Sequence, residues 1–285
     1  MPYLFNTPED ERAMLDAIGA ASMAELLRQV PESLQLQRPL DLPPAQGELE
    51  LTQHMRQLAS RNRDAEQMTC FLGGGSYDHF IPAVVDNLAS RGEFYTSYTP
   101  YQAEVSQGNL QAMFEYQTLI CQLTGLDVSN ASLYDGGSAV TEAALMCLTT
   151  TKRFGKIVVP ETLHPEYRQI LETYCVNLET KVVTLPCPEG RLSPTDLAAE
   201  LDDQTACVIV QQPNFFGNLE PVQQIADATH EAGARLVVSF DPMSLGVLKR
   251  PGDLGADVAV AEGQGLGSPM SYGGPYLGIM ACREE

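Results

Sequence analysis

From about residue 130 onward, short apolar runs alternate with longer stretches whose apolar positions recur at helical spacing. The apolar runs predict strands at residues 156–159, 181–185, 206–210, 235–240, 257–261 and 277–282. The helical stretches between them are residues 138–151, 166–174, 194–201 and 221–232. Alternation at this length predicts an α/β fold with a mainly parallel sheet covered on both faces. Ligands bind such sheets at the carboxyl ends of the strands.

The beginning of the chain follows a different pattern. Thr7 and Pro8 precede apolar residues at helical spacing, which predicts a helix start, and further helices are expected at residues 23–30 and 49–61. We therefore predict a helical N-terminal arm over residues 1–65 and a large α/β domain over residues 66–285. An arm of this kind packs on a partner subunit or on the main domain, or only decorates the domain, and the sequence leaves these readings open.

Composition narrows the choice of partners. The formal net charge of -20 argues against binding to nucleic acid or anionic membranes, because affinity for phosphate comes mainly from Lys and Arg. The seven cysteines are scattered without a CxxC pair, and the four histidines have no metal-ligand spacing, so we expect reduced thiols and no metal site. The first residues do not resemble a secretion signal, and no apolar run is long enough to span a membrane. We expect a soluble, cytoplasmic protein.

The end of the strand at residues 235–240 carries the first chemical signal. Asp241 follows it directly, and an acidic residue in this position can pair with the pyridinium nitrogen of pyridoxal phosphate (PLP). The lysine that would form a Schiff base with the cofactor is missing from the segment at residues 263–269. Only four lysines occur in the chain, and none lies beyond Lys249. The sequence therefore indicates a cofactor-shaped site without its covalent anchor.

Two further segments could complete such a site. Gly136, Gly137 and Ser138 open a predicted helix, whose free N–H groups and positive end could hold a phosphate, although a Gly-Gly-Ser start is also a common helix cap. His164 follows the strand at residues 156–159, where it could stack on a pyridine ring. A histidine in that position could equally cap the next helix or lie at the surface.

Two loop segments are candidates for contacts rather than catalysis. Gly73, Gly74 and Gly75 would let the backbone approach a ligand closely, but the GK[ST] ending of a Walker loop is missing, and a flexible turn is the alternative. The tyrosine-rich segment 94–102 is interrupted by Thr and Pro, so we expect a loop that presents polar aromatic tips to an interface or a cleft. No G-x-S-x-G nucleophile elbow occurs in the chain.

Four strings of residues resemble the P-protein family of glycine decarboxylases. They are YTPYQAEVSQG at residues 98–108, FEYQT at 114–118, TGLDVSNASLYDG at 124–136 and SYGGP at 271–275. Within the family, they are similar to subunit 1, the alpha chain of the two-subunit form. The resemblance extends from the start of the chain to its end.

The resemblance implies a type I PLP-dependent transferase fold and a division of labour between two homologous subunits. Subunit 2 would bind PLP covalently, and the pair, within a heterotetramer, would decarboxylate glycine and pass the aminomethyl group to the lipoyl group of the H-protein. The lysine of subunit 2 falls opposite Gln264, which cannot form an imine. The chain would then contribute no catalytic residue of its own.

The resemblance also implies roles for the candidate residues. Gly136, Gly137, Ser138, His164 and Asp241 would form a vestigial cofactor pocket, with Asp241 opposite the aspartate that pairs with the pyridine nitrogen. The loop residues would face the active site of the partner subunit; these are Gly73, Gly74, Gly75, Tyr98, Tyr101 and Gln102.

Two expectations qualify this reading. Family members continue into a smaller C-terminal domain, so we expect that domain to be absent from this chain. The alternative function is that of a catalytically inert structural or regulatory protein that keeps the PLP fold to hold a complex together.

Overall fold

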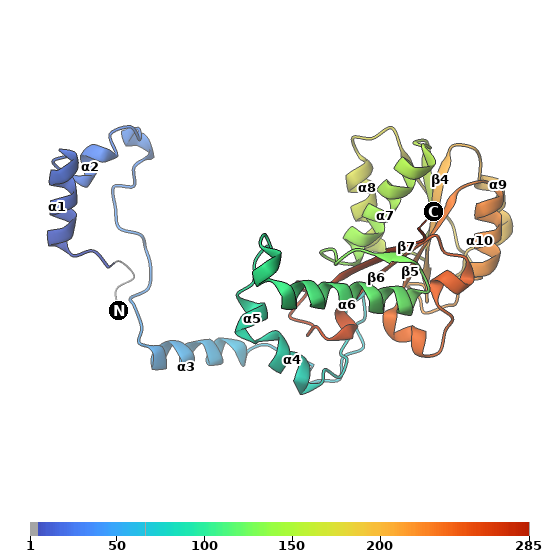
Figure 1. The fold of residues 1–285 in the computed structure, drawn as a ribbon, viewed down its shortest axis with the longest axis horizontal. Coiled ribbons are helices and arrows are strands. Elements are labelled where there is room, and N and C mark those ends of the chain that lie inside the picture. Colours follow the sequence, from blue (N-terminus) through green and yellow to red (C-terminus); the bar gives the residue numbers. More distant parts are fainter. Residues whose placement is uncertain (1–4, 66, 285) are drawn as a thin grey trace. The chain divides into compact units, whose positions relative to one another are not determined.

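A computed structural model describes residues 5–65 and 67–284 of the chain. The backbone divides into two compact units, with the boundary between Arg63 and Asp64. The first unit contains short helices, and the second contains the sheet with its covering helices (Figure 1).

The described residues of the first unit, 5–63, form three α-helices and one short 3-10 helix. They are α1 (Pro8–Ile18), α2 (Met23–Leu26), η1 (Glu32–Leu34) and α3 (Glu48–Ala59). Helix α1 begins as predicted, and Thr7 and Asp10 form a capping box at its start. Helix α2 ends at Leu26, earlier than predicted. None of the described residues in these helices is buried.

The second unit is built on a seven-stranded sheet in the order β1-β7-β6-β5-β4-β2-β3. The strands are β1 (Val128–Ser129), β2 (Lys156–Pro160), β3 (Lys181–Leu185), β4 (Thr205–Gln212), β5 (Arg235–Phe240), β6 (Val258–Glu262) and β7 (Gly278–Cys282). Strands β2 to β6 are parallel, and β7 runs antiparallel to both β6 and β1. The predicted mainly parallel sheet is confirmed, and the antiparallel edge makes it mixed.

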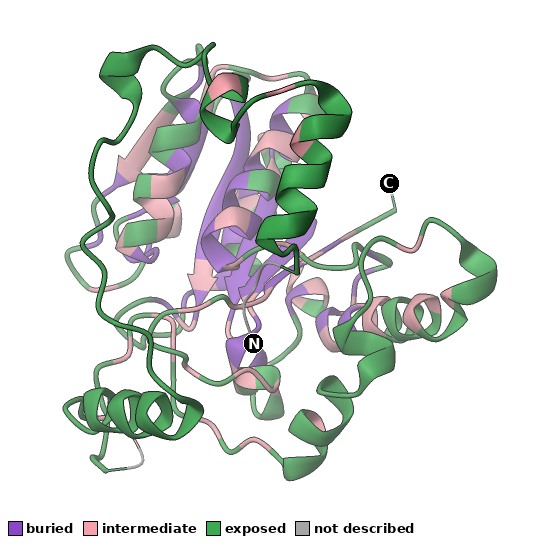
Figure 2. Cartoon of the chain, turned by 90° about the vertical axis from the view of Figure 1, so that its left-hand side faces the viewer, coloured by how far each residue is buried: buried purple, intermediate pink, exposed green. Residues whose placement is uncertain are grey.

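Helices cover both faces of this sheet. Helices α7 (Gly136–Thr151) and α8 (Pro165–Cys175) pack on one face, while α9 (Pro194–Glu200) and α10 (Val222–Glu231) pack on the other. Adjacent residues of a strand alternate between the two cores: Ile157 lies with α7 and α8, and Val158 lies with α9 and α10. The strands form the buried centre between these layers (Figure 2). Because both faces are covered, the strands are continuous apolar runs.

The segment before the sheet contains helices that the sequence pattern did not predict. They are α4 (Ala83–Ala89), α5 (Gly92–Tyr95), the 3-10 helix η2 (Ala103–Val105) and α6 (Gln107–Thr124). Helix α6 packs against β1 and β7, and its Ile120 joins the core on the α9 and α10 side. Three 3-10 helices lie later in the described chain: η3 (Pro242–Gly246) follows β5, η4 (Pro251–Leu254) precedes β6, and η5 (Gln264–Leu266) follows β6.

Two negative findings apply to the described part of the chain. No helix there combines the length and apolarity that a membrane crossing requires. No three His, Cys, Asp or Glu side chains in residues 5–65 and 67–284 come together as a metal site would need. All seven cysteines are free thiols, and four of them are buried.

Candidate functional site

A small pocket of about 50 Å³ lies at the carboxyl ends of β4, β5 and β6. Its walls include four residues singled out from the sequence, Gly75, His164, Asp241 and Gln264. Tyr167 and Glu262 also line it, and neither was predicted from the sequence. Glu262 ends β6 directly before a glycine, so the strand-end argument that identified Asp241 would also have found this residue.

Gln264 lies in η5, two residues after the end of β6, and is only 2% exposed. Its side-chain oxygen accepts a hydrogen bond from the backbone N–H of Tyr77 at 3.0 Å. Its side-chain nitrogen donates to the carbonyl of Ser268 at 2.8 Å. Both the oxygen and the nitrogen of the side-chain amide are thus hydrogen-bonded. A lysine here could not replace it, because an ammonium group has no acceptor for the Tyr77 N–H.

His164 is the N-cap of α8, so the capping role is the one that the structure shows. Its Nδ1 accepts the backbone N–H of Glu166 at 3.1 Å. Nε2 therefore carries the hydrogen and donates it to the Gly74 carbonyl at 2.8 Å. The ring is buried and stacks on Tyr167, with ring centres 4.4 Å apart and planes at 16°. Phe215 packs edge-on at 4.9 Å.

The start of α7, where a phosphate could bind, is already paired with carboxylates. The Gly136 N–H donates to Glu262 Oε2 at 3.0 Å, and the Ser138 N–H donates to Asp135 Oδ1 at 2.7 Å. A Cβ added to Gly136 would collide with the hydroxyl of Tyr167. The small residues at this helix start therefore admit neighbouring side chains rather than leave an open cradle.

The charges around this helix start are negative. Burial raises the pKa of Glu262 above its ordinary value, and the nearby Asp135 carboxylate adds to the effect. Burial also raises the pKa of Tyr167, with Glu262 and Asp135 as the next causes. A phosphate brought to this position would meet two acidic groups and find the Gly136 and Ser138 N–H groups already bonded.

These observations decide whether PLP fits here. Small-molecule sites usually measure about 300–1,000 Å³, whereas this pocket has about 50 Å³. The Asp241 carboxylate caps η3 by accepting the Met243 N–H at 2.9 Å. With the helix start occupied and Tyr167 covering the His164 ring, the residues of this chain do not fit PLP.

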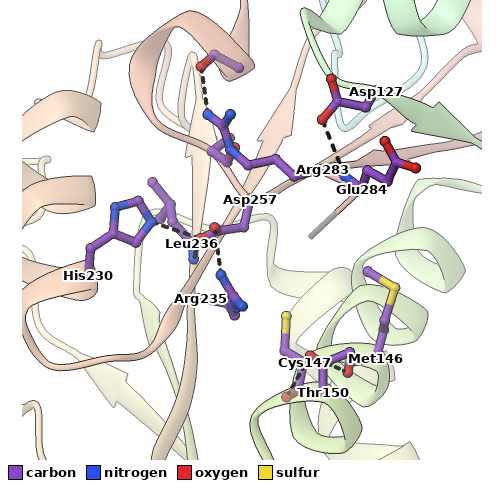
Figure 3. A network of polar contacts seen from close by, with 12 residues as sticks. Asp127, Met146, Cys147, Thr150, His230, Arg235, Leu236, Asp257, Arg283 and Glu284 are labelled. Carbon is purple, nitrogen blue, oxygen red and sulfur yellow. Dashed lines mark hydrogen bonds and ion pairs between the residues drawn. The ribbon is translucent and has the colours of Figure 1, made fainter.

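A second hollow lies at the opposite end of the strands, near the amino ends of β5 and β6. It measures about 490 Å³, and Asp257 lies in its wall at the amino end of β6. The Asp257 carboxylate accepts hydrogen bonds from the Leu236 N–H at 2.7 Å, from His230 at 2.8 Å and from Arg235 at 3.3 Å. Figure 3 shows these groups converging on Asp257. This network connects the amino ends of β5 and β6, at the end of the strands opposite the candidate site.

The two predicted loop segments take different positions. Gly75 reaches the pocket, and all three glycines of residues 73–75 have positive φ angles, of 67°, 86° and 96°, which favour glycine. The tyrosine-rich segment does not line the pocket. Tyr98 and Tyr101 are 92% and 86% exposed, and Gln102 is also exposed. Phe94 and Tyr95 belong to α5, while residues 96–102 lack regular structure, as expected for a loop.

Comparison with known proteins identifies the family of the chain. The family model for the glycine cleavage system P-protein matches residues 1–285. The chain belongs to the P-protein family. The resemblance inferred from the four sequence strings is thereby confirmed.

Curated relatives are close in sequence. A probable glycine dehydrogenase (decarboxylating) subunit 1 from Carboxydothermus hydrogenoformans is 51% identical over 285 residues, which is 100% of this chain and 64% of that protein. A protein of the same name from Desulfitobacterium hafniense is 48% identical with the same coverage. The chain therefore spans a little under two thirds of the length of these P-protein relatives.

Solved structures agree on the fold. A glycine decarboxylase (P-protein) of the glycine cleavage system, in inhibitor-bound form, matches with a TM-score of 0.88 and 46% identity, over 100% of this chain and 63% of that one. A sphingosine-1-phosphate lyase from Burkholderia pseudomallei matches with a TM-score of 0.63 at 14% identity, over 89% of this chain and 63% of that one, which concerns the fold alone. The predicted type I PLP-dependent fold is confirmed.

Proposed function

We propose that this chain belongs to the non-lysine subunit of a cytoplasmic glycine decarboxylase. Together with a homologous subunit 2 it would decarboxylate glycine and transfer the aminomethyl group to the lipoyl group of the H-protein. The family match over residues 1–285 and the names of the relatives support the reaction. The observation that carries the division of labour is Gln264, which is buried and hydrogen-bonded on both sides at the end of β6.

The cofactor would then lie on subunit 2, within a heterotetramer. PLP, when bound there, supplies the electron sink for the carbanion that decarboxylation leaves. The contribution of this chain is to shape and close a neighbouring site. Exposed aromatic side chains on loops of the second unit suit that role, because Tyr side chains combine an apolar body with a polar tip at interfaces. Tyr98 and Tyr101 are the main candidates.

The test is reconstitution from separately produced subunits. Exchange of the glycine carboxyl group with labelled bicarbonate is measured with lipoylated H-protein, for this chain, for subunit 2 and for the two together. We expect exchange only from the pair, and covalently retained PLP, after borohydride reduction, only on subunit 2. Full exchange by subunit 2 alone would favour the structural or regulatory alternative. PLP fixed to this chain would refute the assignment of Gln264.

The loop contribution has its own matched pair of variants. Tyr101→Ala should lower the exchange activity of the pair, since it removes an aromatic contact from the proposed interface. Tyr174 is an exposed tyrosine on α8, and Tyr174→Ala serves as the control. Equal activity of the two variants would contradict the placement of Tyr101 against the partner.

A further inference from the structure

The glycine-rich loop at residues 73–78 is attached to the pocket by side chains from three separate segments. Gln264 accepts the Tyr77 N–H at 3.0 Å, and His164 donates to the Gly74 carbonyl at 2.8 Å. Ser76 shares a hydrogen bond with the hydroxyl of Tyr276, which also donates to the Met270 carbonyl. Gln264 and His164, which line the pocket, and Tyr276 thus use their polar atoms to hold this loop.

The fit of the loop is close as well as polar. A Cβ added to Gly75 would lie 3.3 Å from His164 Nε2, and a Cβ added to Gly265 would lie 2.7 Å from the His79 ring. Three successive positive φ angles bring the glycine backbone against the pocket wall. Only glycine adopts these angles without strain. The backbone conformation and the side-chain contacts therefore specify the same closed position.

The residues that flank this loop in the sequence include large apolar side chains that are almost fully exposed. Phe71 and Leu72, just before the glycines, are 93% and 92% exposed, and Phe80, just after the loop, is 90% exposed. An open hollow of about 580 Å³ is lined by residues between Ala65 and Asp78, including Phe71. Apolar side chains exposed to this extent on both flanks of one anchored loop are typical of a contact surface.

We propose that Gln264 is a positioning residue that holds the loop at residues 73–78 closed over the former cofactor site and so presents Phe71 and Leu72 to subunit 2. The part that concerns subunit 2 rests on the proposed function. The holding of the loop rests only on the contacts within this chain. A lysine at position 264 would release the loop, because it offers no acceptor to Tyr77.

Amide hydrogen exchange of the full chain tests the anchoring. Gln264→Leu and Gln264→Lys should each speed exchange of the Tyr77 amide about three- to tenfold, the change expected for loss of one hydrogen bond. Exchange of amides in the centres of β4 and β5 should stay unchanged. Gln224 is exposed on α10, so Gln224→Leu is the matched control and should leave Tyr77 as in the wild type.

A second variant approaches the same contact from the loop. Gly75→Ala leaves Gln264 intact but places a Cβ at an unfavourable φ and against His164, so it should also speed exchange at Tyr77. Unchanged Tyr77 exchange in the Gln264 variants or in Gly75→Ala would overturn the anchoring.

The complex with subunit 2 tests the presentation of the loop. Gln264→Leu should lower kcat/KM for glycine carboxyl exchange by at least about tenfold, because an ångström of misplacement in a positioning element can cost ~10²-fold. If amide exchange at Tyr77 is faster in Gln264→Leu but kcat/KM of the complex stays at the wild-type value, the proposal that the loop presents Phe71 and Leu72 to subunit 2 is overturned. If the wild-type pair of subunits shows no glycine carboxyl exchange, the proposed function has failed. The amide hydrogen exchange of Tyr77 would still decide whether Gln264 anchors the loop.

Discussion

Replacing Glu262 with alanine removes the carboxylate that satisfies three backbone N–H groups at the carboxyl end of β6. Its oxygens accept from Gly136 at 3.0 Å, from Gln264 at 2.9 Å and from Leu277 at 3.2 Å. These bonds connect the end of β6 to the start of α7 and to the residue before β7. We expect Glu262→Ala to reduce the free energy of unfolding of the second unit.

The magnitude follows from those three contacts. A hydrogen bond to a charged group contributes a net ~1.5–3 kcal/mol, and contributions that share one acceptor are not additive. The bond to Leu277 is the longest, and water can enter the space that the side chain leaves. We therefore expect a loss of about 2–4 kcal/mol, which for a unit of this size lowers the Tm by about 5–15 °C.

Thermal unfolding followed by circular dichroism measures this loss. Glu142 provides the control, because it lies exposed on α7 and Glu142→Ala removes the same charge; a substitution of that kind should change stability by at most about 0.5 kcal/mol. A Tm for Glu262→Ala within about 2 °C of that of the control, a difference of about 0.5–1 kcal/mol, would refute the reasoning, since the three N–H groups would then be satisfied equally well without the carboxylate.

Three further outcomes follow from the same contacts. Asp135→Ala should lower the free energy of unfolding by about 0.5–2 kcal/mol through loss of the α7 cap, with Asp135→Ser recovering most of it; equal losses in both variants would contradict the capping role. Burial raises the pKa of Glu262 above 4.5, so the folded state holds this proton more tightly than the unfolded state. The stability of the wild type relative to Glu262→Gln should therefore decrease as the pH rises from about 4.5 through the raised pKa, and denaturant titrations across that range would show no such slope if the carboxyl were freely solvated. The Tyr116 hydroxyl, whose pKa burial raises to about 12, has no hydrogen-bond partner among the described residues, so Tyr116→Phe should leave the free energy of unfolding unchanged or raise it by up to about 1 kcal/mol; a loss larger than that would show that the hydroxyl is paired.

Elements with a strong local pattern could be predicted from the sequence. The strands β2, β4, β5 and β6 are runs of apolar residues buried on both faces, so composition and length alone mark them, and Asp241 follows from its place after β5. Helix α6 was missed, because only a few of its residues, such as Ile120, are buried. Strand β1 has two residues, too few for any pattern, and exists because it pairs with β7.

The contents of the site could be predicted only in part. The absence of a lysine after Lys249 already indicated that this chain lacks the covalent anchor, and the resemblance pointed to Gln264. The partners of these residues could not be found in the same way. Glu262 meets Gly136 across 126 positions of sequence, and Gln264 meets Tyr77 across 187.

The sequence by itself determined the α/β class, the family and the glutamine at position 264, because each depends on local periodicity or on residue identity. Only the tertiary structure decided that the pocket at the carboxyl ends of β4, β5 and β6 measures just about 50 Å³. The sheet order places the ends of β4, β5 and β6 next to one another, and the carboxylate, ring and amide that meet there come from segments far apart in the chain. Their hydrogen bonds depend on that packing, and no local pattern encodes it.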